Sequence, residues 1–319
     1  MRADVVVVGA GMAGIACARR LAEAGMAPLV LDKGRGIGGR IATRRITLDT
    51  GAALQFDHGA QYVTARDPAF AAVLETLSVK GAAALWQDGA DRSRWVGLPG
   101  MSGLPRALAA GLDIRQSVEV TALHRDGAGW RLETNAGPAH ASLLALSVPA
   151  PQAAALIGAD HALAAPLAAV RMDPCLTLMA AFPAGAQPPV VSDTPHDHPL
   201  AWIAQDSSKP QRPGAAATCW VAQASPDWSA TNLEEAPQAL TARLLPLLAE
   251  RLGLDPAQAL HTSAHRWRFA RVATALGHPF LSHGALWLGG DWCLGARVEA
   301  AWQSGTAMAE DILARAAAG

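Results

Sequence analysis

The chain has 319 residues, of which 51% are hydrophobic and 17% charged, so it is long enough for one large domain or two intertwined ones with a sizeable core. Its formal net charge of -1 argues against nucleic acid or an acidic membrane as the main partner. The sequence has no uninterrupted run of about 18 apolar residues, so no membrane span is predicted. It shows no signal-peptide pattern either, and we therefore expect a cytoplasmic protein.

The first 32 residues predict a βαβ unit, the building block of parallel nucleotide-binding sheets. Val5 to Val8 are expected to form a buried parallel strand. A helical pattern runs from Met12 to Ala24 and is ended by Gly25, and a second strand covers residues 28–32. The segment 33–62, which is rich in glycine, arginine and aspartate, shows little periodicity.

The rest of the chain alternates between helical and strand-like patterns. Helices are predicted at 68–77, 101–110, 232–252 and 298–317, and strands within 82–97, around a hairpin at 118–133, and at 143–148, 175–182, 200–204, 217–223 and 286–291. The proline-rich and glycine-rich stretches 183–199 and 209–214 are interpreted as surface loops. Strand–helix units at both ends, with mostly β structure between them, predict a nucleotide-binding domain interrupted by an inserted domain on an antiparallel sheet.

A glycine fingerprint lies between the first strand and the first helix. It reads Gly9-Ala-Gly11-Met-Ala-Gly14, and its setting of strand before and helix after makes it specific. Gly9 permits the tight turn, Gly11 lets the backbone approach a pyrophosphate, and Gly14 allows close packing of helix on strand. Asp32 ends the second strand, where a carboxylate accepts hydrogen bonds from an adenosine ribose.

Two further segments favour FAD over NAD. Gly38-Gly39-Arg40 follows Asp32 and resembles the GG-Arg motif of the glutathione-reductase-like and amine-oxidase-like flavoproteins, in which the arginine donates to phosphate. Near the C-terminus, Gly290-Asp291 ends a strand and Val298-Glu299 opens the last helix. This segment resembles the second flavin motif of the same group, in which the aspartate bonds a ribityl hydroxyl and the helix dipole faces the flavin.

Segments spread over most of the chain resemble the renalase family, especially its bacterial members. They are 56–66 (FDHGAQYVTAR), 94–97 (RWVG), 99–102 (PGMS), 172–174 (MDP), 208–210 (SKP), 264–267 (AHRW) and 290–294 (GDWCL) with 298–299. Two details depart from the pattern: Asp32 stands where glutamate is commoner among flavoproteins, and His58 stands where a more apolar residue is expected.

The resemblance implies an α/β fold with a Rossmann-like FAD-binding domain, of the p-hydroxybenzoate hydroxylase-like or amine-oxidase-like architecture, and an inserted substrate domain on a mainly antiparallel sheet. We expect residues 1–66, 111–165 and 266–319 in the FAD-binding domain, and 67–110 with 166–265 in the substrate domain. Noncovalent FAD would be held by Gly9, Ala10, Gly11, Met12, Ala13, Gly14, Asp32, Lys33, Arg35, Gly39, Arg40, Gly59, Ala60, Gln61, Tyr62, Val118, Gly290, Asp291, Val298 and Glu299.

The resemblance also implies a reaction. Renalase-like flavoproteins oxidise the 2- or 6-dihydro isomers of NAD(P) to NAD(P)+, with hydride transfer to flavin N5 and reoxidation by O2 to hydrogen peroxide, as metabolite repair. The expected partners are therefore a small dinucleotide substrate and O2. Candidates for the catalytic and substrate-facing side chains are Thr64, Arg66, Trp95, His265, Trp267 and Trp302. Hydride loss from a dihydronicotinamide needs no strong base and mainly an oriented, dry pocket.

Three alternatives stay open at this point. The first is an amine oxidase on the same fold. Many such enzymes use a lysine that holds water near flavin N5, and none of Lys33, Lys80 and Lys209 looks well placed for this in the sequence. The second is an aromatic hydroxylase, which would need NAD(P)H. The third is a flavin- or nucleotide-binding sensor without turnover.

Several polar residues have a structural as well as a functional interpretation. The cysteines lack zinc-like spacing and are expected to be reduced and buried, with Cys293 as a conceivable covalent flavin anchor. His196 and His198 lack nearby partners for a metal, so no metal site is predicted. Arg266, Arg268 and Arg271 could meet a pyrophosphate or form a solvated basic face.

Overall fold

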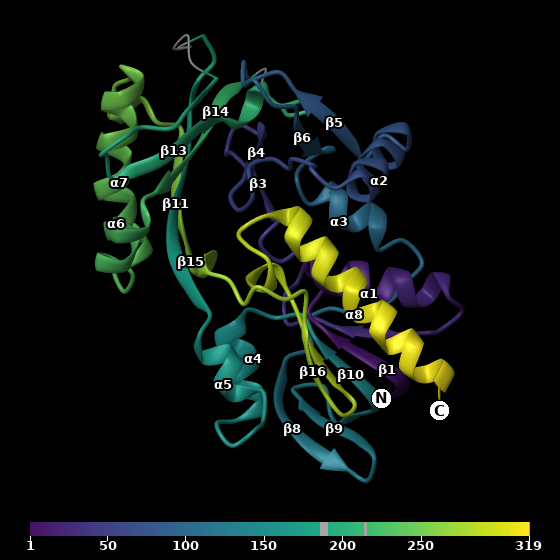
Figure 1. Cartoon of the computed structure of the whole chain (residues 1–319). Coiled ribbons are helices and arrows are strands. Elements are labelled where there is room, and N and C mark those ends of the chain that lie inside the picture. Colours follow the sequence, from purple (N-terminus) through teal and green to yellow (C-terminus); the bar gives the residue numbers. More distant parts are fainter. Residues whose placement is uncertain (186–190, 214–215, 319) are drawn as a thin grey trace.

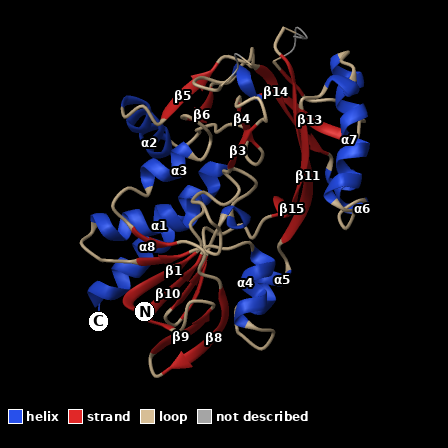
Figure 2. Ribbon diagram, turned by 180° about the vertical axis from the view of Figure 1, so that it is seen from behind, coloured by secondary structure: helices blue, strands red, loops and turns tan. Residues whose placement is uncertain are grey.

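Two sheets of different kinds organise the chain in the computed structural model, which describes residues 1–185, 191–213 and 216–318. Figure 1 shows a mainly parallel sheet at the end of the molecule where both termini lie, and a long antiparallel sheet at the other end. A third region, made of short strands and helices, lies beside the antiparallel sheet (Figure 2). This arrangement confirms the predicted fold class, an α/β nucleotide-binding domain with an antiparallel substrate-domain sheet.

The mainly parallel sheet has eight strands and is built around β1 (Arg2–Val8). β1 pairs in parallel with β10 (Ala139–Leu146) and β2 (Leu29–Leu31). The remaining strands extend the sheet outward: β17 (Leu286–Leu288), β16 (Leu281–His283), β7 (Asp113–Arg115), β8 (Val120–Asp126) and β9 (Gly129–Thr134).

Both faces of this sheet are covered by helices, which explains the unbroken valine run of β1. Val5 and Val7 face α1 (Met12–Glu23) and α8 (Val298–Ala318), because they share a core with Cys17 and Ile312. Val6 and Val8 face the opposite side, which is covered by α4 (Ala150–Ile157) and α5 (Ala164–Ala168). The valines alternate between the two faces because successive side chains of a strand point to opposite sides of the sheet.

The antiparallel sheet has five strands in the order β12 (Ser192–Asp193), β13 (Leu200–Gln205), β14 (Ala217–Ala224), β11 (Arg171–Pro183) and β15 (His261–Thr274). One face packs against α6 (Pro226–Thr231) and α7 (Pro237–Leu252) through alternate residues of β11 such as Leu176 and Leu178. The other face packs on the hairpin of β3 (Thr43–Thr47) and β4 (Ala53–Asp57) through Met179 and Ala181. This second face therefore looks toward the nucleotide-binding sheet.

The third region joins the two sheets at one side. It consists of α2 (Pro68–Val79), the hairpin of β5 (Ala83–Trp86) and β6 (Arg94–Gly97), and α3 (Gly103–Leu108). Three short 3-10 turns complete the fold: η1 (Asp206–Ser208), η2 (Pro256–Gln258) and η3 (Asp291–Cys293). No helix in the described residues is long and apolar enough to cross a membrane.

Some sequence expectations need correction. The segment 33–62 contains the β3–β4 hairpin, whose polar strand residues hid its periodicity, and β15 spans a stretch for which no strand was predicted. The segment 209–214 is not a surface loop throughout, because Lys209 is 2% exposed and Arg212 9%. The boundaries between the two domains stay a prediction. Part of the other predicted loop, residues 186–190, lies outside the described residues.

Candidate active site

The glycine turn has the geometry that a pyrophosphate requires. Gly9 has a φ of +106°, and a Cβ on Gly14 would lie 1.9 Å from the carbonyl oxygen of Gly9, so only glycine fits there. A Cβ on Gly11 would instead meet no atom within 4 Å, which means that the chain leaves open space in front of this residue. α1 begins directly after Gly11 without a side-chain cap, so N–H groups of its first turn remain to bind an anion.

Asp32 lies at the edge of this turn. Its carboxylate accepts hydrogen bonds from the backbone N–H of Ala10 (2.5 Å) and Gly34 (2.7 Å). Val118 donates its N–H to the carbonyl of Asp32 at 2.9 Å, so the structure brings these predicted cofactor residues together. Lys33 is exposed and lies 3.8 Å from Glu119. Arg35 is exposed as well, so both cations lie at the outer surface of the turn.

The two flavin motifs from opposite ends of the chain meet in a bidentate ion pair. Arg40 donates from Nη2 to Oδ1 of Asp291 at 2.6 Å and from Nη1 to Oδ2 at 2.9 Å. Gly38 donates its N–H to the carbonyl of Ala10 at 2.9 Å, which places the GG-Arg loop against the glycine turn. The convergence of motifs 251 residues apart is what a cofactor extended along this edge of the sheet requires.

The segment from His58 to Tyr62 connects the nucleotide motifs to the antiparallel sheet. Ala60 donates its N–H to the carbonyl of Arg40 at 2.9 Å. A Cβ on Gly59 would lie 1.9 Å from that same carbonyl oxygen, so the two backbones touch. From the other side, Gln223 of β14 donates to the carbonyl of Gly59 at 2.8 Å and Trp267 of β15 donates to that of His58 at 2.7 Å.

The face of the antiparallel sheet that looks toward this segment carries aromatic rings. His265 pairs with Thr177 and Trp267 with Cys175, so both side chains share a face with Met179. The rings of His265 and Trp267 are 4.4 Å apart between centroids, and the ring of His58 lies 4.7 Å from the first and 5.2 Å from the second. The predicted substrate-face residues His265 and Trp267 are thus brought together, and His58 joins them.

The histidines of this face have pKa values below the ordinary value of histidine. Burial, together with the positive charge of Arg44, lowers the pKa of His265 to about 4. Burial also lowers the pKa of His58 to about 3, with smaller contributions from His265 and Arg44. The pKa of His261 is lowered by the same two causes, burial first and then Arg44. Arg44 itself lies close by, with Nη2 at 3.5 Å from Nδ1 of His265.

A fully buried ionic cluster lies beneath the His58–Tyr62 segment. The side chains of Asp57, Asp206, Lys209 and Arg212 are all 0% exposed. Lys209 Nζ lies 2.6 Å from Asp206 Oδ1 and 3.3 Å from Asp57 Oδ2, and Arg212 Nη2 lies 2.7 Å from Asp57 Oδ2. Lys209 also reaches Oε1 of Gln61 at 3.4 Å. Two cations and two carboxylates therefore balance inside the protein.

The pKa values of the cluster carboxyls follow from this arrangement. Burial raises the pKa of both, but the charges of Lys209 and Arg212 hold the pKa of Asp57 below its usual value. The hydroxyl of Thr43 and the N–H of Met101 also donate to Asp57, at 2.7 and 2.9 Å. The pKa of Asp206 is raised, by burial and by the charge of Asp57. Asp57 is thus the firmly ionised member that anchors the segment.

Other predicted site residues lie around the same region. Trp95 exchanges two backbone hydrogen bonds of 2.8 Å with Val63, and the ring of Trp302 lies 5.3 Å from that of Phe70. Thr64 is half-buried and Arg66 is exposed. Val298 packs in the same hydrophobic cluster as Ala60, Tyr62, Met12, Trp95 and Trp302.

Glu299 has a structural partner of its own. Its carboxylate accepts from the backbone N–H groups of Arg66 (2.6 Å) and Asp67 (2.7 Å) and pairs with Arg297 at 3.0 Å. It therefore ties the start of α8 to the loop before α2.

The structure also resolves the ambiguous side chains. All four cysteines are buried as predicted, and burial raises the pKa of Cys293 to about 12, which keeps it a thiol. Arg266 and Arg268 pair with Glu234 beside α7, on the face away from the site. The described residues contain no group of three or more histidine, cysteine, aspartate or glutamate side chains that could hold a metal ion.

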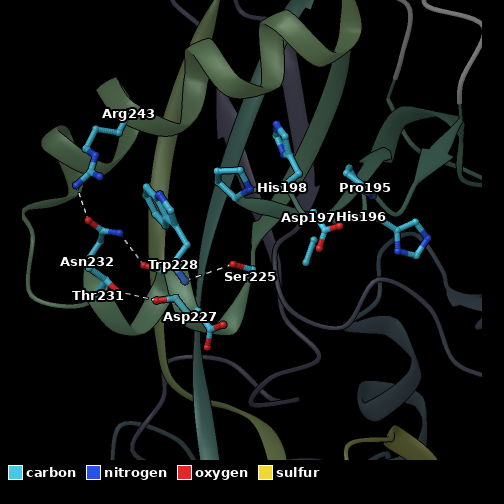
Figure 3. A pocket seen from close by; sticks show the side chains of 12 residues that line it. Pro195, His196, Asp197, His198, Ser225, Asp227, Trp228, Thr231, Asn232 and Arg243 are labelled. Carbon is cyan, nitrogen blue, oxygen red and sulfur yellow. Dashed lines mark hydrogen bonds between the residues drawn. The ribbon is translucent and has the colours of Figure 1, made fainter.

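His196 and His198 line a separate hollow beside α6 (Figure 3). Its other lining residues are Pro195, Asp197, Pro199, Ala201, Ser225, Asp227, Trp228, Thr231, Asn232 and Arg243. The hydrogen bonds drawn there join residues of the hollow to one another, as between Arg243 and Asn232. The hollow lies on the helix-covered side of the antiparallel sheet, apart from the site described above.

Sequence reasoning missed the ionic cluster, Arg44 and Gln223. No local pattern marks Lys209 or Arg212 as buried. By contrast, the alternation of His261, Ser263, His265 and Trp267 along residues 261–267 is a period-two pattern that could have placed both rings on one face.

The residues present fit a flavin dinucleotide. The glycine cradle, Asp32, the Arg40–Asp291 pair and the start of α8 lie along one edge of the sheet, where they would meet the phosphates, ribose and ring of such a cofactor. Comparison with known proteins agrees. The profile of an NAD(P)-binding Rossmann-like domain matches residues 7–77, and that of flavin-containing amine oxidoreductases matches residues 76–313.

Solved structures share this fold over nearly the whole chain. A protein from Exiguobacterium sp. 255-15, provisionally assigned as a protoporphyrinogen oxidase, superposes with a TM-score of 0.79 at 14% identity, covering 98% of both chains. A putrescine oxidase with bound putrescine gives 0.73 at 13% identity, covering 98% of this chain and 99% of the other.

Fold and site thus define a flavin-dependent oxidoreductase with a Rossmann-like cofactor domain. The chain belongs to the flavin-containing amine oxidoreductase family.

Proposed function

We propose that the protein is an FAD-dependent oxidase of the 2- or 6-dihydro isomers of NAD(P), which it converts to NAD(P)+. Bound FAD would supply the hydride acceptor and pass the electrons to O2, giving hydrogen peroxide. The substrate loses a hydride from its ring and becomes an aromatic pyridinium, so no side chain has to remove a proton. The task left to this chain is to bind the ring, orient it and exclude water.

The observation that carries the proposal is the uncharged aromatic face next to a cation. His265 and Trp267 present flat rings, the buried ring of His58 packs against them, and the low pKa values of about 3 and 4 keep both histidines neutral. Arg44 lies beside His265, and no carboxylate of the described residues lies within ion-pair distance of it. A face of this kind suits a ring with a phosphate-bearing tail and repels an ammonium group.

Amine oxidation is the second candidate, and the family match favours it. The matched profile describes amine oxidoreductases, and one of the similar structures binds putrescine. Lys209 is also closer to the segment 58–62, which is predicted to line the flavin, than its place in the sequence suggested, at 3.4 Å from Gln61. Its ammonium group, however, is bonded to Asp57 and Asp206 and completely enclosed, so it already has its partners.

A direct test is anaerobic mixing of the FAD-loaded protein with each substrate class while the flavin absorbance near ~450 nm is followed. We expect rapid bleaching by one dihydro isomer of NAD and peroxide formation when air is admitted. Bleaching by putrescine or benzylamine, with no response to either dihydro isomer, would replace the proposal with amine oxidation. A flavoprotein that neither class bleaches would point to the sensor alternative.

A further inference from the structure

Arg94 of β6 lies against two aromatic rings at the edge of the candidate active site. Its guanidinium carbon is 4.3 Å from the ring centroid of Tyr62 and 5.0 Å from that of Trp202. The two rings are themselves 5.5 Å apart at an angle of 53°. Tyr62 belongs to the flavin-lining segment. Trp202 of β13 pairs with Gln223, the residue that holds the carbonyl of Gly59.

The guanidinium is fixed in this position by a buried anchor. Nη1 of Arg94 forms an ion pair with Asp88, whose side chain is only 2% exposed, and lies 3.3 Å from the hydroxyl of Ser192. Ser192 in turn donates to the same Asp88 oxygen at 3.0 Å. The cation thus sits against the rings before any substrate arrives, and side-chain entropy has already been lost.

The polar groups left over at this place are all donors. Within the described part of the chain, Nε and Nη2 of Arg94 have no hydrogen-bond acceptor, and Nε1 of Trp202 is buried without one. A guanidinium and an indole N–H cannot accept a hydrogen bond. The indole N–H is enclosed, so a ligand can reach only the guanidinium, and a ligand that bonds it must carry an acceptor oxygen, such as a phosphate, a carboxylate or a carboxamide carbonyl.

Aromatic rings commonly bind ammonium ligands, and the positive charge of the ligand then lies over the ring faces. Here the positive charge belongs to the protein itself. An incoming ammonium group would meet the like charge of the guanidinium, whose partner carboxylate on Asp88 is almost fully enclosed, whereas an anionic or carbonyl oxygen would meet a positive charge and free N–H groups.

We propose that Arg94 selects substrates by charge: its guanidinium fills the cation position of the Tyr62–Trp202 pair, so that the site admits a donor bearing an acceptor oxygen and rejects amines. This inference rests on the proposed function only for the identity of the favoured substrate. The exclusion of ammonium groups depends on the geometry alone.

The test compares FAD-loaded wild type, Arg94→Met and the control Arg92→Met by isothermal calorimetry with two probes, putrescine and NAD+. Arg92 lies two residues away and is exposed, so its replacement removes the same charge without touching the rings. For Arg94→Met we expect putrescine to bind at least about tenfold more tightly and NAD+ about tenfold more weakly, each a change of about 1.4 kcal/mol. Arg92→Met should match wild type with both probes.

Two results would overturn the proposal: Arg94→Met behaving like Arg92→Met with both probes, or wild type binding putrescine as tightly as Arg94→Met does. If Arg94→Met does not fold, as judged by circular dichroism, Arg94→Gln replaces it with the same expectations. Arg94→Lys restores a cation and should again exclude putrescine. Failure of the dihydro isomers to bleach the flavin, with the putrescine result intact, would remove the proposed function and leave charge selection standing.

Discussion

The glycine turn and the buried ionic cluster place their polar groups in opposite ways. In the turn, a few consecutive residues leave open space in front of Gly11 and unbonded N–H groups at the start of α1. In the ionic cluster, side chains from separate segments come together in the interior, and two buried cations are matched by Asp57 and Asp206. The first region offers N–H donors to a ligand, while in the second the charges are paired within the protein.

The largest expected effect is the loss of stability when a cation is removed from the buried ionic cluster. Lys209→Met leaves Asp57 and Asp206 buried with one cation fewer, which should lower the free energy of unfolding by about 3–5 kcal/mol. Urea denaturation monitored by tryptophan fluorescence measures it. The control Lys33→Met removes a surface pair with Glu119 at 3.8 Å and should cost less than about 1 kcal/mol. Equal losses in both variants would contradict the assigned role of the cluster.

A pH series tests the neutral histidines of the substrate face. The folded-state pKa values of about 3 and 4 for His58 and His265 lie below the usual 6.5, so the unfolded chain binds more protons between these limits. Stability is therefore fully present above pH 6.5 and falls as the pH drops toward 4, by up to about 1.4 kcal/mol per pH unit for each histidine.

Urea midpoints at pH 7 and pH 5 measure this slope. The double variant His58→Gln/His265→Gln should flatten it, and His278→Gln, at an exposed position, should leave it unchanged. A slope that persists in the double variant would show that other groups take up the protons.

The glycine turn is tested by filling its open space. Gly11→Ala has a backbone conformation that alanine adopts freely, φ -76° and ψ 179°, so the fold should keep its melting temperature. FAD affinity should fall by about tenfold or more, about 1.4 kcal/mol, because the methyl group takes the place of the pyrophosphate. Fluorescence titration of the deflavinated protein measures this, with Gly36→Ala as a control in equally open space. Unchanged affinity in Gly11→Ala would move the pyrophosphate away from this turn.

The smallest effect belongs to the basic surface beside α7. Glu234→Gln removes the partner of Arg266 and Arg268 at an exposed position. The urea midpoint should stay at the wild-type value, with FAD and dinucleotide affinity unaltered. A measurable gain in dinucleotide affinity would instead place the phosphate tail of the substrate on these arginines, because the competing carboxylate is gone.

The contrast between the two regions also explains which parts of the site could be predicted from the sequence. The turn was predictable because its strand, glycines, helix and Asp32 are neighbours in the chain, and each obeys a local steric rule. Arg40 and Asp291 were each recognised by motif, although only the fold shows that they bond to each other.

The interior of the site was far less predictable. Lys209 stands in a Ser-Lys-Pro sequence typical of exposed loops, and its burial depends on Asp57, 152 residues earlier. Likewise, the sequence pattern marked Arg94 only as part of the segment 94–97, and its contact with Trp202 depends on how β6 and β13 pack. The period of two along β15 could have shown that His265 and Trp267 share one face of the strand. It could not have shown that this face contacts His58.

The crossing of α1 and α8 has a consequence for the order of events during synthesis. A Cβ on Gly305 would lie 2.0 Å from the carbonyl oxygen of Ala13, so the last helix touches the backbone of the first just behind the glycine turn. β17 and Asp291 also lie late in the sequence, more than 250 residues after Asp32. The dinucleotide fingerprint is therefore synthesised long before the residues that close the cradle, so the cofactor site is complete only after α8 has been made. Separately expressed fragments 1–284 and 285–319 should each fail to retain flavin and should regain it only on mixing.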